Sequence, residues 1–115
     1  GKDFAQLHDF FANLYQELFA AADTIAEEIR ALDDYAPYNM TELASTTTVK
    51  ESNIYGVDVS GMLADLIDAN GSVIEALNTA HKLADADDNR GLVNLIEERL
   101  DIHAKHAWML RATSK

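Results

Sequence analysis

The sequence predicts an all-α protein built from long amphipathic helices. Two observations carry this prediction. Apolar residues recur at spacings of three and four along most of the 115 residues, which is the spacing of one helix face. In addition, 48% of the residues are apolar and only one is a proline, so the chain can fill a core and has few helix breaks. We therefore expect a single all-α domain over residues 1–115.

The first long helix is predicted over residues 3–32. Its apolar positions keep to one helix face until the segment "ALDD" ends the pattern. These positions are Phe4, Leu7, Phe11, Leu14, Leu18, Ile25, Ile29 and Leu32.

The apolar pattern lapses between Asp33 and Val57. This segment carries Pro37, clustered threonines and Gly56, which are typical of a connection rather than a helix. Thr41 could cap a short helix through "TELAS". We therefore expect a long connection that contains one or two helical turns.

Two further helices are predicted in the second half of the chain. The periodic pattern returns behind a cap at Asp58 or Ser60 and continues as far as Leu83. A tight acidic turn, "DADDN", follows, and Asp88 or Asn89 can cap a last helix that runs to the C-terminus. The apolar positions are Met62, Leu63, Leu66, Ile67, Val73, Ile74, Leu77 and Leu83 in the second helix, and Val93, Ile96, Leu100, Ala107 and Leu110 in the last.

The lengths of the connections predict how these helices run. A helix of about 28 residues is roughly 40 Å long, so a short turn joins antiparallel neighbours, whereas a parallel neighbour needs a long return. We therefore expect the last two helices to be antiparallel and the first two to be parallel. One long crossover of this kind distinguishes ferritin-like four-helix bundles from up-and-down bundles. The sequence contains three of the four long helices, so the fourth comes from another chain or from sequence before residue 1.

Composition excludes several classes of function. A net charge of −11 disfavours direct DNA binding, because basic side chains carry most nucleic-acid affinity. Cysteine is absent, so metal ligands have to come from His, Asp and Glu, and a reducing cytoplasmic compartment is expected. No apolar run reaches the roughly 20 residues of a membrane-spanning helix, and no signal peptide is visible. Motifs of nucleophilic, phosphoryl-transfer and hydride-transfer enzymes are also absent from the sequence.

Three side chains on the first predicted helix could form half of a metal site. His8 and Asp23 are about 22 Å apart along the axis but only about 60° apart around it, and Glu27 lies about 40° further. One chain cannot bring them together, but a second copy packed antiparallel across a twofold axis near Gln16 would make two equivalent sites. On spacing alone, solvated carboxylates and a polar histidine are the favoured interpretation, because D-x-x-x-E is common on helices.

Three segments, "FAQLHDFF", "AADTIAEEIRALDD" and "DDNRGLVNLIEERLDIHAKHAWMLRA", resemble the Dps family, the small ferritins of starved bacterial cells. The resemblance implies a ferritin-like fold and a cytoplasmic, hollow dodecamer built from twofold dimers. It also implies ferroxidase activity, in which Fe(II) is oxidised with hydrogen peroxide and stored as ferric mineral. The family's site lies at the dimer interface, which makes His8, Asp23 and Glu27 the expected catalytic residues and iron ligands.

Two departures from the family pattern affect this expectation. Ala12 stands where the family commonly has an acidic residue, one turn after the histidine. The family's preceding helix, which carries a further ligand histidine in a His-Trp-Asn segment, is not in this sequence, so an N-terminally truncated chain is expected. The alternative function is therefore a non-catalytic helical assembly protein that keeps the shell without a complete ferroxidase site.

Other candidate residues carry weaker predictions. His103 and His106 have a spacing close to that of metal ligands, but their resemblance to the family's closing segment favours a packing or interface role. His81 is expected at the surface, and Trp108 is expected in buried packing. By resemblance, the crossover aromatics Tyr35, Tyr38 and Tyr55 are expected across the twofold interface. Acidic residues could line pores that attract Fe(II), although Asn94 departs from the family there; these acids are Asp85, Asp87, Asp88, Glu97, Glu98 and Asp101.

Overall fold

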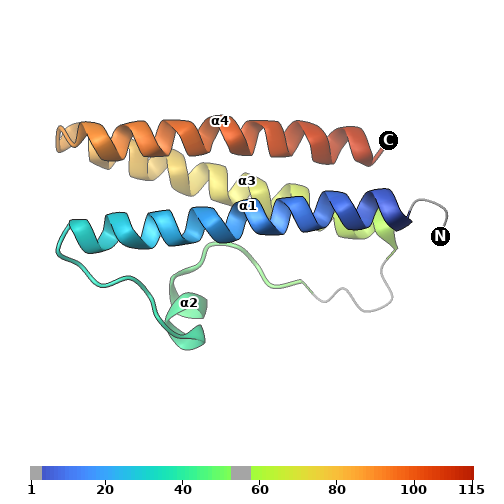
Figure 1. Ribbon diagram of the computed structural model, residues 1–115, viewed down its shortest axis with the longest axis horizontal. Coiled ribbons are helices and arrows are strands. Elements are labelled where there is room, and N and C mark those ends of the chain that lie inside the picture. Colours follow the sequence, from blue (N-terminus) through green and yellow to red (C-terminus); the bar gives the residue numbers. More distant parts are fainter. Residues whose placement is uncertain (1–3, 53–57) are drawn as a thin grey trace. The chain divides into compact units, whose positions relative to one another are not determined.

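The computed structural model describes residues 4–52 and 58–115, and these residues form four helices and no strand (Figure 1). The helices are α1 (Phe4–Ala31), α2 (Met40–Thr46), α3 (Val59–Ala86) and α4 (Arg90–Thr113). The all-α prediction is therefore confirmed, and the long helices begin and end within a few residues of the predicted bounds. None of the described helices combines the length and apolar character that crossing a membrane requires.

The chain divides into two compact units, residues 1–45 and 46–115. The first unit holds α1 and most of α2, and the second holds α3 and α4. The first two long helices, α1 and α3, belong to different units, so the parallel arrangement expected for them stays a prediction.

The C-terminal end of α1 is closed by an aspartate in the left-handed conformation. Asp33 has a φ of 63°, and the backbone N–H of Asp34 donates to the carbonyl of Ile29 at 3.3 Å. The N–H of Asp33 donates to the carbonyl of Arg30 at 3.0 Å, which completes a Schellman motif. Glycine usually occupies this position, since a left-handed φ strains a residue that has a Cβ atom.

The short helix α2 was expected, but its predicted cap is wrong. The helix begins at Met40, so Thr41 lies inside it. Asn39 is the cap instead, because its side-chain Oδ1 accepts the N–H of Glu42 at 2.9 Å. The Glu42 carboxylate in turn accepts the N–H of Tyr38 at 3.2 Å, so two backbone donors near the helix start are satisfied.

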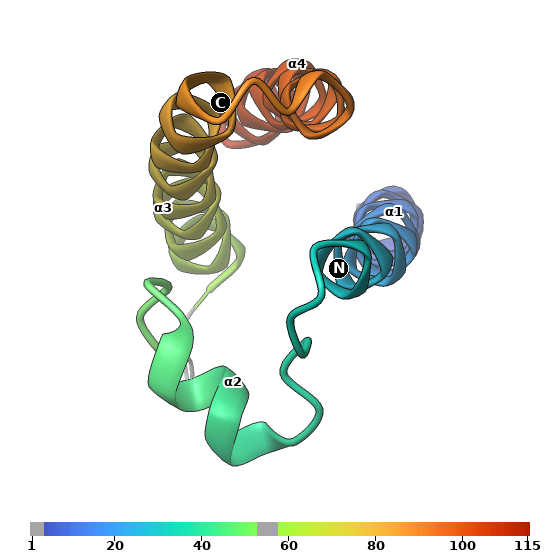
Figure 2. The same ribbon diagram turned by 90° about the vertical axis from the view of Figure 1, so that its left-hand side faces the viewer.

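In the second unit, α3 and α4 lie side by side and antiparallel, as predicted (Figure 2). Asp58 caps α3 by accepting the N–H of Gly61 at 2.9 Å, which makes Ser60 part of the helix. Asp88 is not the cap of α4; it takes the left-handed conformation at the end of α3, with a φ of 54°. Asn89 caps α4 by accepting the N–H of Leu92 at 3.1 Å.

Apolar side chains of α3 and α4 form the core of the second unit. Leu63 is 2% exposed and Leu110 is 1% exposed, and Ile96 and Ala84 are also buried. The inward stripe predicted for the last helix is therefore confirmed at Ile96 and Leu110. Leu83, which was counted in the periodic pattern of α3, is instead 69% exposed.

Candidate metal centre

The three predicted ligands all lie on α1 and are all exposed. His8 is near the start of the helix, and Asp23 and Glu27 are one turn apart near its end. Among residues 4–52 and 58–115, no three His, Asp or Glu side chains lie close enough together to hold a metal ion. The axial separation of about 22 Å between His8 and Asp23 explains why these three ligands do not meet.

The carboxylates of Asp23 and Glu27 are open to a ligand. Neither forms an ion pair or a side-chain hydrogen bond within the part of the chain that the structure describes. Both are exposed, and residues spaced by four lie about 40° apart around a helix, so they share one side of α1. Two like charges at this spacing repel each other, and a divalent cation would relieve that repulsion.

The imidazole of His8 is held by an aromatic neighbour. Its ring stacks on Phe4, with the ring centroids 5.7 Å apart and the planes 19° apart. Phe4 is itself 67% exposed, so both rings face solvent in a single protomer. The stack restricts the ring, and His8 as a whole remains exposed.

A stripe of exposed aromatic side chains runs along the same side of α1. Tyr15 is 67% exposed and Phe19 is 61% exposed, and their rings stack with centroids 6.0 Å apart. At about 100° per residue, Phe4, Tyr15, His8 and Phe19 fall within about 60° of one another. Tyr15 and Phe19 were not among the residues predicted to matter from the sequence. Their four-residue spacing, just outside the apolar face, was the available signal.

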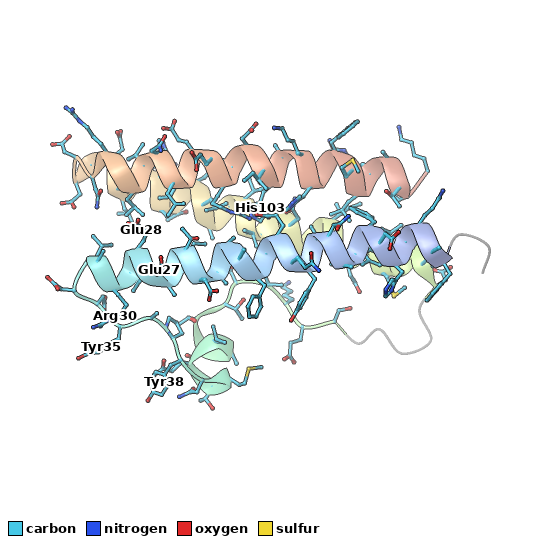
Figure 3. The ribbon with its side chains drawn as sticks, viewed as in Figure 1. Glu27, Glu28, Arg30, Tyr35, Tyr38 and His103 are labelled. Atoms are coloured by element: carbon cyan, nitrogen blue, oxygen red, sulfur yellow. The ribbon has the colours of Figure 1, made fainter. Side chains whose placement is uncertain are left out.

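Arg30 lies one turn after Glu27 but is held by the segment that follows α1. Its guanidinium carbon is 4.6 Å from the centroid of the Tyr35 ring, and its Nη1 donates to the carbonyl of Asp34 at 2.9 Å. Figure 3 shows Arg30 and Tyr35 together where the chain leaves the helix. An exposed cation–π contact contributes about 0.5–1 kcal/mol and an i,i+3 ion pair about 0.2–0.5 kcal/mol, so this contact and the hydrogen bond together outweigh pairing with Glu27.

His103 has a packing role, as favoured from the sequence. It is 3% exposed, and its Nε2 lies 2.7 Å from the guanidinium of Arg99. Its Nδ1 lies 2.8 Å from the Oδ1 of Asn70 on α3, and the Asn70 amide donates to the His103 carbonyl at 2.9 Å. Because a guanidinium only donates, Nε2 accepts and Nδ1 carries the proton. Both ring nitrogens are thus engaged, and neither is free for a metal.

Two other sequence predictions concern exposure. His81 keeps 31% of its side chain exposed, and its Nε2 lies 3.7 Å from the Oε2 of Glu97 across the α3–α4 pair. Trp108 is 60% exposed, so its expected burial is wrong for the single protomer. Trp108 points outward because α4 covers α3 with a different side, the one that carries His103 and Leu110.

The remaining predictions concern contacts between copies of the chain. The acids proposed for a pore are all exposed, and Asp101 forms an ion pair with Lys105 at 3.0 Å. A solvated surface would look the same, so the pore stays a prediction. Of the crossover aromatics, Tyr35 is 81% and Tyr38 is 82% exposed, whereas Tyr55 lies outside the described residues.

Comparison with known proteins identifies the family. The sequence model of the ferritin-like domain matches residues 1–115. General stress protein 20U of Bacillus subtilis is 32% identical, with 97% of this chain and 77% of that protein covered. DNA protection during starvation protein 2 of Bacillus anthracis is 30% identical, with 97% and 76% covered. The chain spans 63% of the length of a low temperature-induced protein of Nostoc that is 27% identical.

Solved structures agree on the fold. Antigen TpF1 of Treponema pallidum matches with a TM-score of 0.92 and 26% identity, over 100% of this chain and 74% of that chain. Dps of Staphylococcus aureus matches with a TM-score of 0.93 and 24% identity, over 100% and 76%. The chain is therefore a member of the ferritin-like domain family with its all-α fold. Within that family it belongs to the Dps proteins.

Proposed function

We propose that this protein is an iron-storage subunit that oxidises Fe(II) at sites shared between two copies of the chain and keeps the ferric product in an oligomeric shell. The observation that carries the proposal is the set of His8, Asp23 and Glu27 on one side of α1, with both carboxylates free of cation partners in the described residues. Relatives in the Dps family support the same conclusion, since one is named for protection during starvation and one solved neighbour is described as a ferritin-like diiron-carboxylate protein.

A second copy of α1 completes this site. In an antiparallel pair with its axis near Gln16, His8 of one copy lies opposite Asp23 and Glu27 of the other, and the dimer has two equivalent sites. The same axis brings together two copies of the Tyr15–Phe19 pair, which is exposed in the protomer. Contiguous exposed aromatic surface of this kind marks an interface. The stripe of exposed aromatic side chains and the spacing of the three ligands therefore support the same dimer.

The ligand set suits ferrous iron. One imidazole and two carboxylates leave positions open for water or peroxide, unlike a closed structural zinc site. In the proposed reaction, two Fe(II) ions each give one electron to hydrogen peroxide; its O–O bond breaks, and two protons complete two molecules of water. The net charge of −11 favours the approach of cations. We propose a dodecamer built from six such dimers as the shell, and no direct DNA binding.

Ala12 supports a second candidate, a helical assembly protein without oxidation activity. It stands one turn after His8, where an acidic side chain would add a ligand or hold the histidine. In this case the aromatic stripe would still build the dimer, but iron would not be oxidised.

Peroxide-dependent oxidation of Fe(II) separates the two candidates. The assay uses protein whose assembly has been verified by light scattering, under anaerobic conditions with peroxide as the only oxidant. The native protein should oxidise Fe(II) faster than buffer and leave a soluble ferric core. Glu27→Gln should lose at least about tenfold in rate, because one ligand loses its charge. Glu28→Gln is the matched control and should keep the rate.

Two outcomes would count against iron oxidation. A native protein no faster than buffer would favour the assembly protein. Equal loss in the Glu27→Gln and Glu28→Gln variants would show that the carboxylate on this side of α1 has no special role.

A further inference from the structure

Arg30 is the cation best placed to compete with a metal for Glu27. The two residues are three positions apart on α1, the spacing at which a glutamate and an arginine pair on a helix surface. Such a pair would neutralise one of the two carboxylates and place a positive charge beside the bound ion. The structure shows no ion pair between them in the described part of the chain.

The segment that follows α1 contacts the Arg30 guanidinium and holds it apart from Glu27. Arg30 lies over the Tyr35 ring at 4.6 Å and donates to the Asp34 carbonyl at 2.9 Å. The segment is itself ordered, since the backbone N–H of Tyr35 donates to the Asp34 side chain at 2.8 Å and the Schellman motif at Asp33 sets its direction. Two independent contacts therefore draw Arg30 beyond the end of the helix and away from the Glu27 side.

We propose that Tyr35 is a positioning residue, which holds Arg30 away from Glu27 and so keeps the two carboxylates available to a divalent cation. The proposal rests on the proposed function, because it takes Glu27 as a metal ligand. Tyr35 does not touch the metal; it acts through the position of the Arg30 charge. This assigns a role to a tyrosine that is 81% exposed in the single protomer.

Tyr35→Ala should weaken metal binding through the freed guanidinium. Moving a unit charge from roughly 10 Å to roughly 5 Å from a dication in water corresponds to about a fourfold loss of affinity. The probe is Co²⁺, which accepts the same nitrogen and oxygen ligands, and the measurement is calorimetric titration of the assembled protein. The Co²⁺ binding measured for the Glu27→Gln variant is subtracted from that of each other protein, because it reports binding outside the proposed site. The loss should shrink as sodium chloride is raised, because salt screens exposed charges.

Three further variants separate positioning from a structural effect. Tyr35→Phe keeps the aromatic face and should bind like the native protein. The double variant Arg30→Gln/Tyr35→Ala should bind at least as tightly as the native protein, because no cation remains to compete. Tyr38→Ala removes an equally exposed tyrosine that does not contact Arg30, and it should leave the affinity unchanged.

The outcomes distinguish this proposal from the one on which it rests. If the native and Glu27→Gln proteins bind Co²⁺ alike, the proposed metal site is wrong. If they differ but Tyr35→Ala binds like the native protein, only the role of Tyr35 is wrong. The role of Tyr35 is also wrong if the double variant stays weak or if Tyr38→Ala loses as much affinity.

Discussion

The two units of this chain use polar side chains in opposite ways. In the α3–α4 pair, Asn70, Arg99 and His103 form a hydrogen-bonded network with its centre at a buried ring. On α1, Asp23 and Glu27 are exposed and have no cation partner among the described residues. Buried polar groups that bond to one another fix how two helices pack. Exposed polar groups without a partner in the protein are available for a ligand or another chain. The difference separates the part that holds the fold from the part that we propose carries the function.

Metal-dependent stability tests the α1 side of this comparison and should give the largest effect. Divalent metal at about a hundred times its dissociation constant should stabilise the dimer by about 2.7 kcal/mol for each of its two sites. Glu27→Ala should remove most of that gain and change the metal-free protein little, since it also removes a repulsion with Asp23. The measurement is thermal unfolding with and without Fe(II) under anaerobic conditions.

Mixing two variants sharpens this test. A dimer formed from one His8→Ala subunit and one Glu27→Ala subunit keeps all three ligands at one of its two sites. The mixture should therefore recover part of the metal-dependent shift. Full shifts in both single variants, or no recovery after verified subunit exchange, would contradict a site shared between chains.

The buried network predicts the next largest effect. Asn70→Ala removes the acceptor of the His103 Nδ1–H and one donor to the His103 carbonyl, and it should destabilise the protein by about 1–3 kcal/mol. Asn78→Ala is the matched control, because it is the same substitution at an exposed position of α3 and carries the same change in helix propensity. Urea unfolding at one protein concentration compares them. Equal midpoints for the two variants would show that the network does not hold α3 against α4.

The smallest effect concerns a feature that both units share. Asp33 and Asp88 each end a long helix in the left-handed conformation, with φ values of 63° and 54°. Asp33→Gly and Asp88→Gly should each stabilise the protein by at most about 1 kcal/mol, because glycine adopts this conformation without a clash from a Cβ atom. Thermal unfolding measures the gain. A loss of stability at Asp88 alone would indicate that its side chain contributes to the turn beyond the backbone hydrogen bonds.

Much of the local structure followed from the sequence, because its causes lie within a few residues. The three- and four-residue spacing of apolar side chains predicted the long helices, and Asp58 was among the predicted caps. The short connection at "DADDN" predicted the antiparallel pair of α3 and α4. The spacing of His8, Asp23 and Glu27 is likewise a property of the sequence, and their role as ligands stays a prediction.

The tertiary structure decided which of several possible partners each side chain takes. Periodicity treats His103 as one more residue on α4, but Arg99 occupies its Nε2 and Asn70, across the helix pair, occupies its Nδ1, so the ring is removed from metal binding. Trp108 was expected inside and is exposed, because the register of α4 on α3 selects the face that is buried. Similarly, the spacing of Glu27 and Arg30 allows an ion pair. The path of the chain after Asp33 instead places the Tyr35 ring and the Asp34 carbonyl in contact with the Arg30 guanidinium. Helix periods depend on neighbours in sequence, whereas these choices depend on contacts between side chains that only the folded chain brings together.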